Sequence, residues 1–172
     1  KGSMEAPEEV MLDVNQMAQG QNFYQVATWE LSPDQQRLAY FEDNVGRRQY
    51  TLKVKDLASG ETLPVAIGGL SAGAAWSADG STIYYVENDP VTLLTRRVKA
   101  HRLGSDPATD AVVYEETDDS FYMGIGQTRS EQYVCIFLAS TVSSEQRCTP
   151  AAAPGEFRVL AARERDFEYS AD

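Results

Sequence analysis

Hydrophobic and polar residues alternate in short runs along most of the chain, and this period of two is typical of β-strands with one buried face. The runs are rich in aromatic and β-branched residues, and clusters of Gly, Pro, Asp and Asn separate them. Helical spacing is confined to the segment 8–17. We therefore predict an all-β fold with strands at 23–30, 37–42, 49–56, 62–67, 74–76, 82–87, 96–103, 111–115, 121–125, 133–140 and 157–163.

One pattern recurs along the chain. Segment 29–40 reads Trp-x-x-Ser-x-Asp-x-x-x-Leu-x-Tyr, and its serine, aspartate and tyrosine return 45 residues later in segment 76–85. A weaker third copy lies 51 residues further on, with Thr128 at the serine position and Ser130 at the aspartate position. Periods of about 40 to 50 residues that hold about four short strands are typical of β-propeller blades.

The repeated Ser-x-Asp segment predicts a tight turn between the first two strands of each blade, because its side-chain oxygens can accept hydrogen bonds from backbone amides. We expect the repeated Trp and Tyr side chains to fill the space between blades. Two unrelated hairpins with similar turns are the alternative, but the constant offset favours a repeat. The sequence thus predicts a partial β-propeller of about three to four blades, each a four-stranded antiparallel sheet.

The length is not a whole number of repeats, since 172 residues divided by 45 is about 3.8. We interpret residues 5–172 as a partial β-propeller domain, an arc cut from a larger ring. The first residues, 1–4 (Lys-Gly-Ser-Met), look like the remnant of a cleaved tag and are left out of the fold prediction.

Charge and hydropathy exclude two kinds of partner. Twenty-six acidic and 15 basic residues give a net charge of -11, the wrong sign for binding a nucleic acid. Apolar runs are all shorter than the roughly 18 residues that a membrane-spanning helix needs. We therefore expect neither nucleic acid nor membrane as a partner.

The sequence has two cysteines, Cys135 and Cys148, which are too few for a disulfide scaffold and lack histidines at zinc-binding spacing. Cys135 lies in an apolar run, so we expect a buried free thiol and a reduced, cytoplasmic location. A bridge to Cys148 across a hairpin is the alternative.

Residues 69–73 match the Gly-x-Ser-x-Gly motif of hydrolases, and Asp89 and His101 follow in the order acid, histidine. That motif requires a strand, a sharp turn and a helix, whereas this segment runs directly into the next repeat. We interpret it as a flexible linker between blades. A small hydrolase that uses Ser71 is the rival hypothesis.

His101 is the only histidine, and strand alternation puts it on one face with Arg97 and Lys99. We expect that face to be solvated rather than to form a binding site.

Carboxylates recur at one repeat position. The triplets 42–44 (Glu-Asp-Asn) and 87–89 (Glu-Asn-Asp) lie 45 residues apart. Equivalent loops of neighbouring blades share one face of a propeller, so these carboxylates would form a negative patch that attracts cationic peptides. Two solvated acidic loops would have the same sequence.

Segments along most of the chain carry a family resemblance. They are 40–52 (YFEDNVGRRQYTL), 54–57 (VKDL), 59–60 (SG), 85–90 (YVENDP), 101–108 (HRLGSDPA), 114–121 (YEETDDSF), 143–147 (SSEQR) and 163–169 (RERDFEY). Together they resemble the propeller of the oligopeptidase B branch of the prolyl oligopeptidase family of serine peptidases. The resemblance covers nearly the whole chain after residue 4.

The resemblance implies a seven-bladed propeller joined to a C-terminal α/β-hydrolase domain, whose Ser-Asp-His triad cleaves short peptides after Lys or Arg. The family's Gly-Gly-Ser-x-Gly-Gly motif is absent, because residues 68–73 only mimic it at the position of a propeller linker. We therefore assign no catalytic residue and expect this chain to be inactive alone.

The resemblance also implies a role for the propeller as a lid that limits access to small peptides. Candidates for an interdomain or gating contact are Glu42, Asp43, Arg47, Arg48, Glu87 and Asp89. A stable hairpin tip with an internal Glu/Arg pair is the alternative for the first four.

We expect no cofactor and no metal site. The expected partners are short basic peptides, acting through the intact parent protein, and the missing α/β-hydrolase domain. Self-association is also expected, because the end blades of an arc expose faces and strand edges. The alternative function is a self-contained propeller that binds basic peptides or protein partners.

Overall fold

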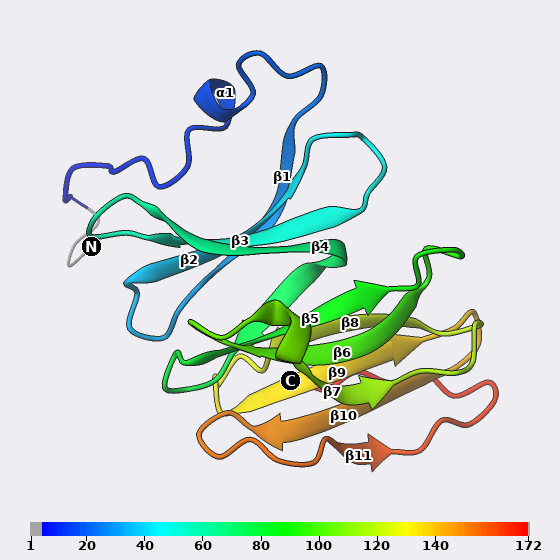
Figure 1. The fold of residues 1–172 in the computed structure, drawn as a ribbon. Helices are drawn as coiled ribbons and strands as arrows, with labels where there is room; N and C mark the ends of the chain where they lie inside the picture. Colours follow the sequence, from blue (N-terminus) through cyan, green and yellow to red (C-terminus); the bar gives the residue numbers. More distant parts are fainter. Residues whose placement is uncertain (1–4, 172) are drawn as a thin grey trace.

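The computed structural model describes residues 5–171, so the predicted tag remnant at 1–4 lies outside the described residues. Two antiparallel sheets make up the fold (Figure 1), with strand orders β1-β2-β3-β4-β5-β6-β7 and β11-β10-β9-β8. The strands are β1 (Gln25–Leu31), β2 (Arg37–Asp43), β3 (Tyr50–Asp56), β4 (Thr62–Trp76), β5 (Thr82–Asn88), β6 (Thr95–Arg102), β7 (Ala111–Glu115), β8 (Tyr122–Gln127), β9 (Tyr133–Ala139), β10 (Ser144–Pro150) and β11 (Arg158–Ala161). Two short helices are α1 (Val14–Met17) and the 3-10 helix η1 (Pro107–Thr109).

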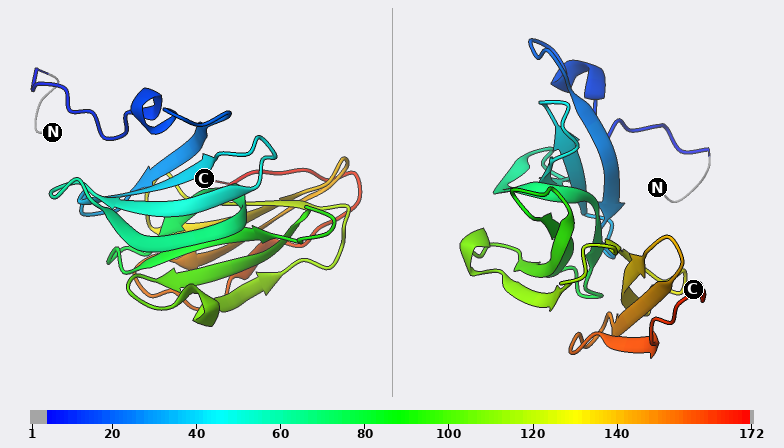
Figure 2. Two further views of the ribbon diagram at one scale, coloured as in Figure 1. Left: turned by 45° about the horizontal axis from the view of Figure 1, so that its top comes forward. Right: turned by 90° about the vertical axis from the view of Figure 1, so that its right-hand side faces the viewer.

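The strands form three propeller blades, which confirms the predicted partial propeller. The first blade is β1, β2, β3 and the first part of β4; the second is the last part of β4 with β5, β6 and β7; the third is β8 to β11. In Figure 2 the second blade lies between the first and the third. Within each blade the first strand is innermost and the fourth outermost.

Strand β4 belongs to two blades. Its start pairs with β3 and its end with β5, and the pairing register shifts between Leu70 and Ala74. Gly73 lies in this irregular stretch with φ +138°, and a Cβ there would stand 3.6 Å from the carbonyl oxygen of Ile125 in the third blade. The predicted flexible linker at 69–73 is therefore wrong, because the connection between blades is a continuous strand.

The repeated turns have the predicted structure. Ser32 accepts a hydrogen bond from the Arg37 amide at 2.9 Å, and Ser77 accepts one from the Thr82 amide at 3.0 Å. In the third copy Thr128 accepts the equivalent bond from the Tyr133 amide at 3.2 Å.

The residue two positions after each of these hydroxyls completes the turn. Asp34 accepts a hydrogen bond from the Ser32 hydroxyl, and Asp79 accepts one from the Ser77 hydroxyl, both at 2.5 Å. Each carboxylate also accepts a hydrogen bond from a backbone amide at 3.0 Å. Ser130 takes this position in the third copy, 3.1 Å from Thr128. The repeat predicted from sequence is thus the same hydrogen-bonded turn used three times.

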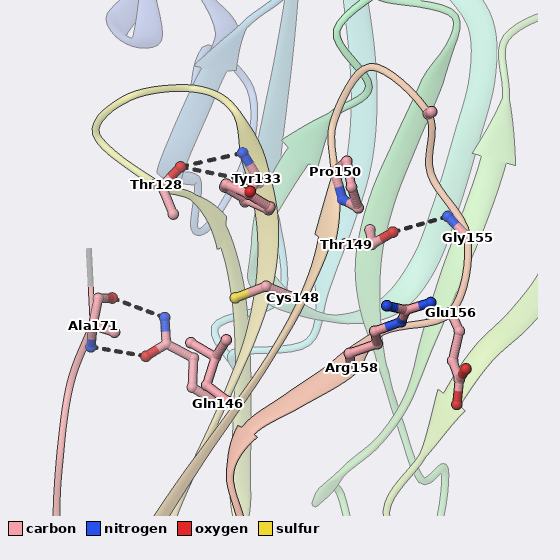
Figure 3. A pocket seen from close by; sticks show the side chains of 12 residues that line it. Thr128, Tyr133, Gln146, Cys148, Thr149, Pro150, Gly155, Glu156, Arg158 and Ala171 are labelled. Carbon is pink, nitrogen blue, oxygen red and sulfur yellow. Dashed lines mark hydrogen bonds between the residues drawn. The ribbon is translucent and has the colours of Figure 1, made fainter.

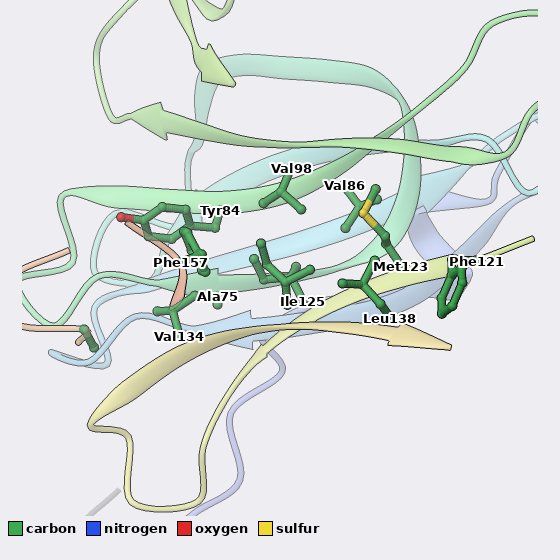
Figure 4. Packing of buried hydrophobic residues seen from close by; sticks show 12 residues of the cluster. Ala75, Tyr84, Val86, Val98, Phe121, Met123, Ile125, Val134, Leu138 and Phe157 are labelled. Carbon is green, nitrogen blue, oxygen red and sulfur yellow. The ribbon is translucent and has the colours of Figure 1, made fainter. Parts of the chain in front are cut away.

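Hydrophobic clusters fill the two spaces between blades. Phe41, Leu52, Trp76 and Tyr85 belong to the cluster between the first and second blades. Figure 4 shows the cluster between the second and third blades, to which Tyr84, Val86, Val98, Met123, Ile125, Val134 and Leu138 contribute. The prediction for the repeated Trp holds for Trp76, which is fully buried, whereas Trp29 is 51% exposed because it lies on the outer face of the first blade.

Side chains near the ends of the inner strands also tie blades together. The indole Nε1 of Trp76 donates a hydrogen bond to the Glu30 carbonyl at 3.3 Å. The amide Nε2 of Gln127 donates one to the Trp76 carbonyl at 3.0 Å.

Cys135 and Cys148 form a disulfide between directly paired positions of β9 and β10. The expectation of a free core thiol is therefore wrong, and the cross-hairpin alternative is correct. Strand β10 itself was not among the predicted strands.

The two end faces of the arc are partly covered. Residues of the N-terminal segment cross the outer face of the first blade, where Lys55 Nζ donates to the Met11 carbonyl at 2.8 Å. On the outer face of the third blade lies a cavity of about 650 Å³ (Figure 3). Gln146 borders it and holds Ala171 through both backbone groups, at 2.8 and 2.9 Å. The last described residues thus run across the face that a further blade would cover.

Candidate functional site

The six candidate residues lie at one rim of the arc, which we call the loop rim. It carries the connections between the second and third strands of each blade, residues 44–49, 89–94 and 140–143, on the right in Figure 1. The fourth strand of each blade also ends here. Asn88 Nδ2 donates a hydrogen bond to Gln49 Oε1 at 3.0 Å, which links the loops of the first and second blades.

Glu42 is at the end of β2 and is only 8% exposed. Its carboxylate lies 2.6 Å from Lys53 Nζ and accepts a hydrogen bond from the Tyr24 hydroxyl at 2.7 Å. The hydrogen bond to Glu42 raises the pKa of Lys53 above its usual value. Burial, with the hydrogen bond to Glu42, also raises the pKa of Tyr24. The negative charge of Glu42 is therefore balanced within the first blade.

Asp43 is 2% exposed and organises the loop that follows it. Its carboxylate accepts hydrogen bonds from the amides of Val45, Gly46 and Arg48 at 2.8 to 2.9 Å. Burial would raise the pKa of Asp43, but these backbone N–H groups oppose burial and hold that pKa below its usual value. The loop is thereby fixed with positive φ at Gly46 (+82°) and Arg48 (+56°).

In the second blade Glu87 makes ion pairs, as Glu42 does in the first, and Asp89 binds loop amides, as Asp43 does. Glu87 lies 3.1 Å from Lys99 Nζ and 3.4 Å from an Arg97 nitrogen. Asp89 accepts hydrogen bonds from the amides of Thr92 and Val91, both at 2.8 Å, and these lower its pKa. The four candidate carboxylates therefore make ion pairs or shape loops within the chain.

Arg47 and Arg48 differ from the other four candidates because both side chains are exposed. Within residues 5–171 neither guanidinium forms an ion pair. They stand beside the apolar tip residue Val45, which is 63% exposed, and the neighbouring loop presents Val91 at 87%. The outward surface of these two loops is thus basic and apolar rather than acidic.

A charged cluster that sequence analysis missed joins the second and third blades at the same rim. The guanidinium of Arg163, in the segment after β11, lies 2.7 Å from Glu116 and 3.3 Å from Glu145. It also stacks over the Phe121 ring at 3.9 Å. Arg147 adds a 2.6 Å contact to Glu145. The members come from separate segments, so no local sequence pattern could have indicated the cluster.

The residues of the hydrolase-like motif are not arranged for catalysis. Ser71 lies within strand β4, and the next element is strand β5 rather than a helix. His101 is fully buried, with Nδ1 2.9 Å from Asp110, a carboxylate that also accepts the Tyr85 hydroxyl at 2.9 Å. The expectation of a solvated face is therefore wrong at His101, which is buried with Asp110, although Arg97 on the same face of β6 is 39% exposed.

In the part of the chain that the structure describes, no three His, Cys, Asp or Glu side chains are grouped to hold a metal ion. Over the same residues, no helix has the length and apolar character needed to cross a membrane.

Comparison with known proteins agrees with the blade architecture. Residues 1–172 match the family model described as the N-terminal β-propeller domain of prolyl oligopeptidase. The chain belongs to the prolyl oligopeptidase family.

Two curated proteins are similar to this chain in sequence. Dipeptidyl aminopeptidase BI of Pseudoxanthomonas mexicana is 55% identical over 97% of this chain, and Protease 2 of Moraxella lacunata is 32% identical over 82%. The chain spans 23% of the length of the first relative and 21% of the second.

A solved structure confirms the fold. Oligopeptidase B from Leishmania major superimposes with a TM-score of 0.89 at 24% identity, over 99% of this chain and 24% of that one. This likeness supports the fold alone. Membership of the prolyl oligopeptidase family thus accounts for the blades.

Proposed function

We propose that this chain is part of the propeller of a serine peptidase, and that it gates the access of short peptides to a catalytic site elsewhere in the polypeptide. The observation that carries this proposal is an unclosed arc of three blades that matches the family's propeller domain throughout. A propeller needs at least about four blades to close. Relatives about four times as long as this chain have room for both the missing blades and a catalytic domain.

The arrangement of Ser71 and His101 supports placing catalysis outside this chain. A serine nucleophile needs a base within hydrogen-bonding reach and donors for the developing oxyanion. His101 instead pairs with Asp110, and both side chains are buried. The chain alone should therefore be inactive toward peptides.

Two substrate classes are candidates for the complete peptidase. The resemblance to oligopeptidase B favours cleavage of short peptides after Lys or Arg. The 55% identity to a protein named dipeptidyl aminopeptidase BI favours dipeptidyl aminopeptidase activity instead. We prefer the second class, because the identity to Protease 2 is only 32%.

The full-length protein tests this proposal directly. Fluorogenic peptides with free and with blocked amino termini, carrying either basic or neutral residues before the scissile bond, should separate the two classes. A serine-directed phosphonate should label the full-length protein but not the 172-residue chain. Cleavage of an arginyl peptide by the chain alone, abolished in Ser71→Ala, would overturn the proposal.

The alternative of a self-contained module for basic peptides receives less support from the site. Glu42 and Glu87 are paired with basic side chains, and Asp43 and Asp89 are engaged by loop amides. Calorimetry with a tri-lysine peptide tests this alternative: saturable binding by the chain alone would favour it over the gating role.

A further inference from the structure

We propose that Cys148 is a site of reversible modification by a small peptide-like thiol such as glutathione, through exchange with the disulfide that joins Cys148 to Cys135. The attached molecule occupies the cavity on the outer face of the third blade and loosens the segment that follows β11. The modification goes beyond the proposed function, because it needs no catalytic site.

The disulfide lies on the outer face of the third blade. Strand alternation puts Ser144, Gln146 and Cys148 on one face of β10, and the last two line the cavity of about 650 Å³. The other face of this sheet packs against the second blade through Val134 and Leu138. Cavities of this size hold small organic ligands in proteins. A small thiol can therefore approach the disulfide from the outer face.

The two sulfur-bearing residues differ in access. Cys135 is fully buried, whereas Cys148 is half-buried and belongs to the lining of the cavity (Figure 3). Which sulfur a thiolate attacks, and how fast, depends on access as well as on thiol chemistry. The accessible member, Cys148, is therefore the one attacked, and Cys135 is the leaving group.

The exchange balances without a further reactant. The incoming thiol loses its proton to solvent, and its thiolate forms a bond to Cys148 Sγ while the bond to Cys135 Sγ breaks. The electron pair of that bond passes to Cys135 Sγ, which takes up a proton and becomes a thiol. Cys148 then carries the incoming molecule as a mixed disulfide. The reverse attack by Cys135 releases the molecule and restores the original bond.

Charged side chains beside Cys148 indicate the class of thiol. Arg158 lies directly opposite Cys148 in the pairing of β10 with β11, and it lines the cavity together with Glu156. Within residues 5–171 neither side chain forms an ion pair. A guanidinium binds carboxylates through matched N–H groups, and a carboxylate binds ammonium groups. A thiol that carries both groups, as glutathione does, therefore fits better than a neutral thiol.

The segment after β11 is bound to the same face of β10. Ser144 Oγ donates to the Tyr169 carbonyl at 2.9 Å and accepts from the Tyr169 amide at 2.7 Å. Gln146 makes the equivalent two bonds to Ala171, at 2.8 and 2.9 Å. Cys148 is the next residue of β10 on this face, and Ala171 also lines the cavity. A molecule attached to Cys148 therefore competes with this segment for space.

In the peptidase of the proposed function, residues 164–171 lead from the third blade to the rest of the propeller. Modification of Cys148 would then weaken the contact between the third blade and its neighbour. This consequence rests on the proposed function, whereas the modification and its effect on residues 164–171 do not.

Two single-cysteine variants test the site. Cys135→Ala leaves Cys148 as a lone thiol and Cys148→Ala leaves Cys135, and both lack the disulfide equally. Circular dichroism confirms that each variant folds. With oxidised glutathione, mass spectrometry should show the Cys135→Ala variant gaining one glutathione at least about tenfold faster than the Cys148→Ala variant. Equal rates, or a faster reaction of Cys148→Ala, would overturn the assignment to Cys148.

The unsubstituted chain gives a second test of the same site. After incubation of the folded chain with excess reduced glutathione and an acid quench, peptide mapping should find glutathione on Cys148 and a free thiol on Cys135. Glutathione on Cys135, or an adduct only after the chain has been unfolded, would overturn the proposal.

The class of thiol is tested by Arg158→Gln in the Cys135→Ala background. The rate of modification by oxidised glutathione should fall about fivefold, because the carboxylates lose their guanidinium partner, while the rate with the neutral disulfide of 2-mercaptoethanol stays the same. Arg165→Gln is the matched control, since Arg165 is 87% exposed and does not line the cavity. An equal change with both reagents would overturn recognition by charge.

Hydrogen exchange tests the effect on the segment after β11. In the glutathione-modified Cys135→Ala variant, the amides of Tyr169 and Ala171 should exchange about tenfold faster than in the unmodified variant. Unchanged exchange in the modified variant would overturn the loosening. None of these measurements needs peptidase activity. If the full-length protein cleaves no peptide, only the proposed function fails, and if it cleaves peptides while Cys148 stays unmodified, only this inference fails.

Discussion

The indole N–H of Trp76 donates a hydrogen bond to the backbone carbonyl of Glu30, at 3.3 Å, across the boundary between the first two blades. Gln127 lies 51 residues after Trp76 and makes the corresponding bond to the Trp76 carbonyl at 3.0 Å. Each boundary therefore combines an apolar cluster with one side-chain bond to the preceding blade's inner strand.

Substituting Trp76 should destabilise the boundary between the first two blades. Trp76→Phe keeps an aromatic ring but leaves the Glu30 carbonyl without its donor, so the free energy of unfolding should fall by about 1–3 kcal/mol. Urea denaturation measures this change. Trp29→Phe is the control, because Trp29 is half exposed and should change stability little. Equal effects of the two substitutions would contradict the role given to the Trp76 bond.

Removing Arg163 should loosen the third blade from the second. In Arg163→Met the carboxylates of Glu116 and Glu145, 6% and 4% exposed, lose their shared partner. We expect a loss of about 2–4 kcal/mol in unfolding free energy. Arg165→Met is the matched control, since Arg165 is 87% exposed. Amide hydrogen exchange should become faster in β8 to β11. Unchanged exchange there would contradict the role of Arg163 in joining the two blades.

The contribution of the Asp79 carboxylate to stability should be lost at low pH. The Ser77 hydroxyl, followed by the Ser81 amide and hydroxyl, lowers the pKa of Asp79 to about 2. A carboxyl with a lowered folded pKa stabilises the fold above its ordinary pKa of about 3.9 and loses that effect as pH falls toward 2. Ser77→Ala should raise the Asp79 pKa toward its ordinary value in a carboxyl NMR titration. Ser105→Ala should leave it unchanged, and a similar shift in both variants would contradict this cause.

The Cys135–Cys148 disulfide should stabilise the third blade. It closes a loop with a sequence separation of 13, so reduction should remove about 3 kcal/mol of stability, seen as a lower Tm with dithiothreitol. The Cys135→Ala/Cys148→Ala variant should lack this response. Thiol titration of the unreduced protein should find no free cysteine.

The same bond gives a test of location. The cytoplasmic location predicted from the low cysteine content stays a prediction, and cytosolic proteins rarely keep disulfides. We propose cell fractionation followed by thiol titration to distinguish a reduced protein in the cytoplasm from an oxidised protein outside it. Reduced protein in the cytoplasm would support the original prediction, whereas oxidised protein in an extracytoplasmic fraction would contradict it.

The chain alone should associate through the outer face of its third blade. Leu160 borders the cavity there and is 53% exposed, and Tyr133 beside it is 44% exposed. Light scattering should show a mass above 19.0 kDa that rises with concentration, and Leu160→Asp should lower it. Val112→Asp, on the edge strand β7, is the control. A strictly monomeric mass at high concentration would count against self-association.

The sequence predicted the blades because their turns are local. A hydroxyl and a carboxylate two residues apart close the Ser32 and Ser77 turns, so the chemistry that makes the turn also makes the repeat visible. The pairing of Glu42 with Lys53, by contrast, depends on strand register, and the ion pairs of Arg163 depend on how two blades pack together. Neither leaves a pattern in one stretch of sequence.

Buried polar residues account for one missed strand and for one residue whose burial was mispredicted. Strand β10 was missed because its buried positions are Glu145, Gln146 and Thr149, each satisfied by a specific partner rather than by apolar packing. His101 shares a face with Arg97, as alternation predicts, but it is fully buried and its ring nitrogen lies 2.9 Å from Asp110. Hydrophobic periodicity reports which face a residue is on and cannot report how far a neighbouring sheet extends over it.

The shared strand β4 also determines how this arc can be divided. Its 15 residues run from the first blade into the second as one strand, although the pairing register shifts between Leu70 and Ala74, so these two blades should exchange amide hydrogens and unfold as one cooperative unit. The third blade is joined through residues 116–121, through side chains and through a backbone hydrogen bond from the Ala78 amide to the Ala151 carbonyl at 2.9 Å. A protease, a circular permutation or a domain insertion should therefore be tolerated between β7 and β8 and not at the earlier boundary.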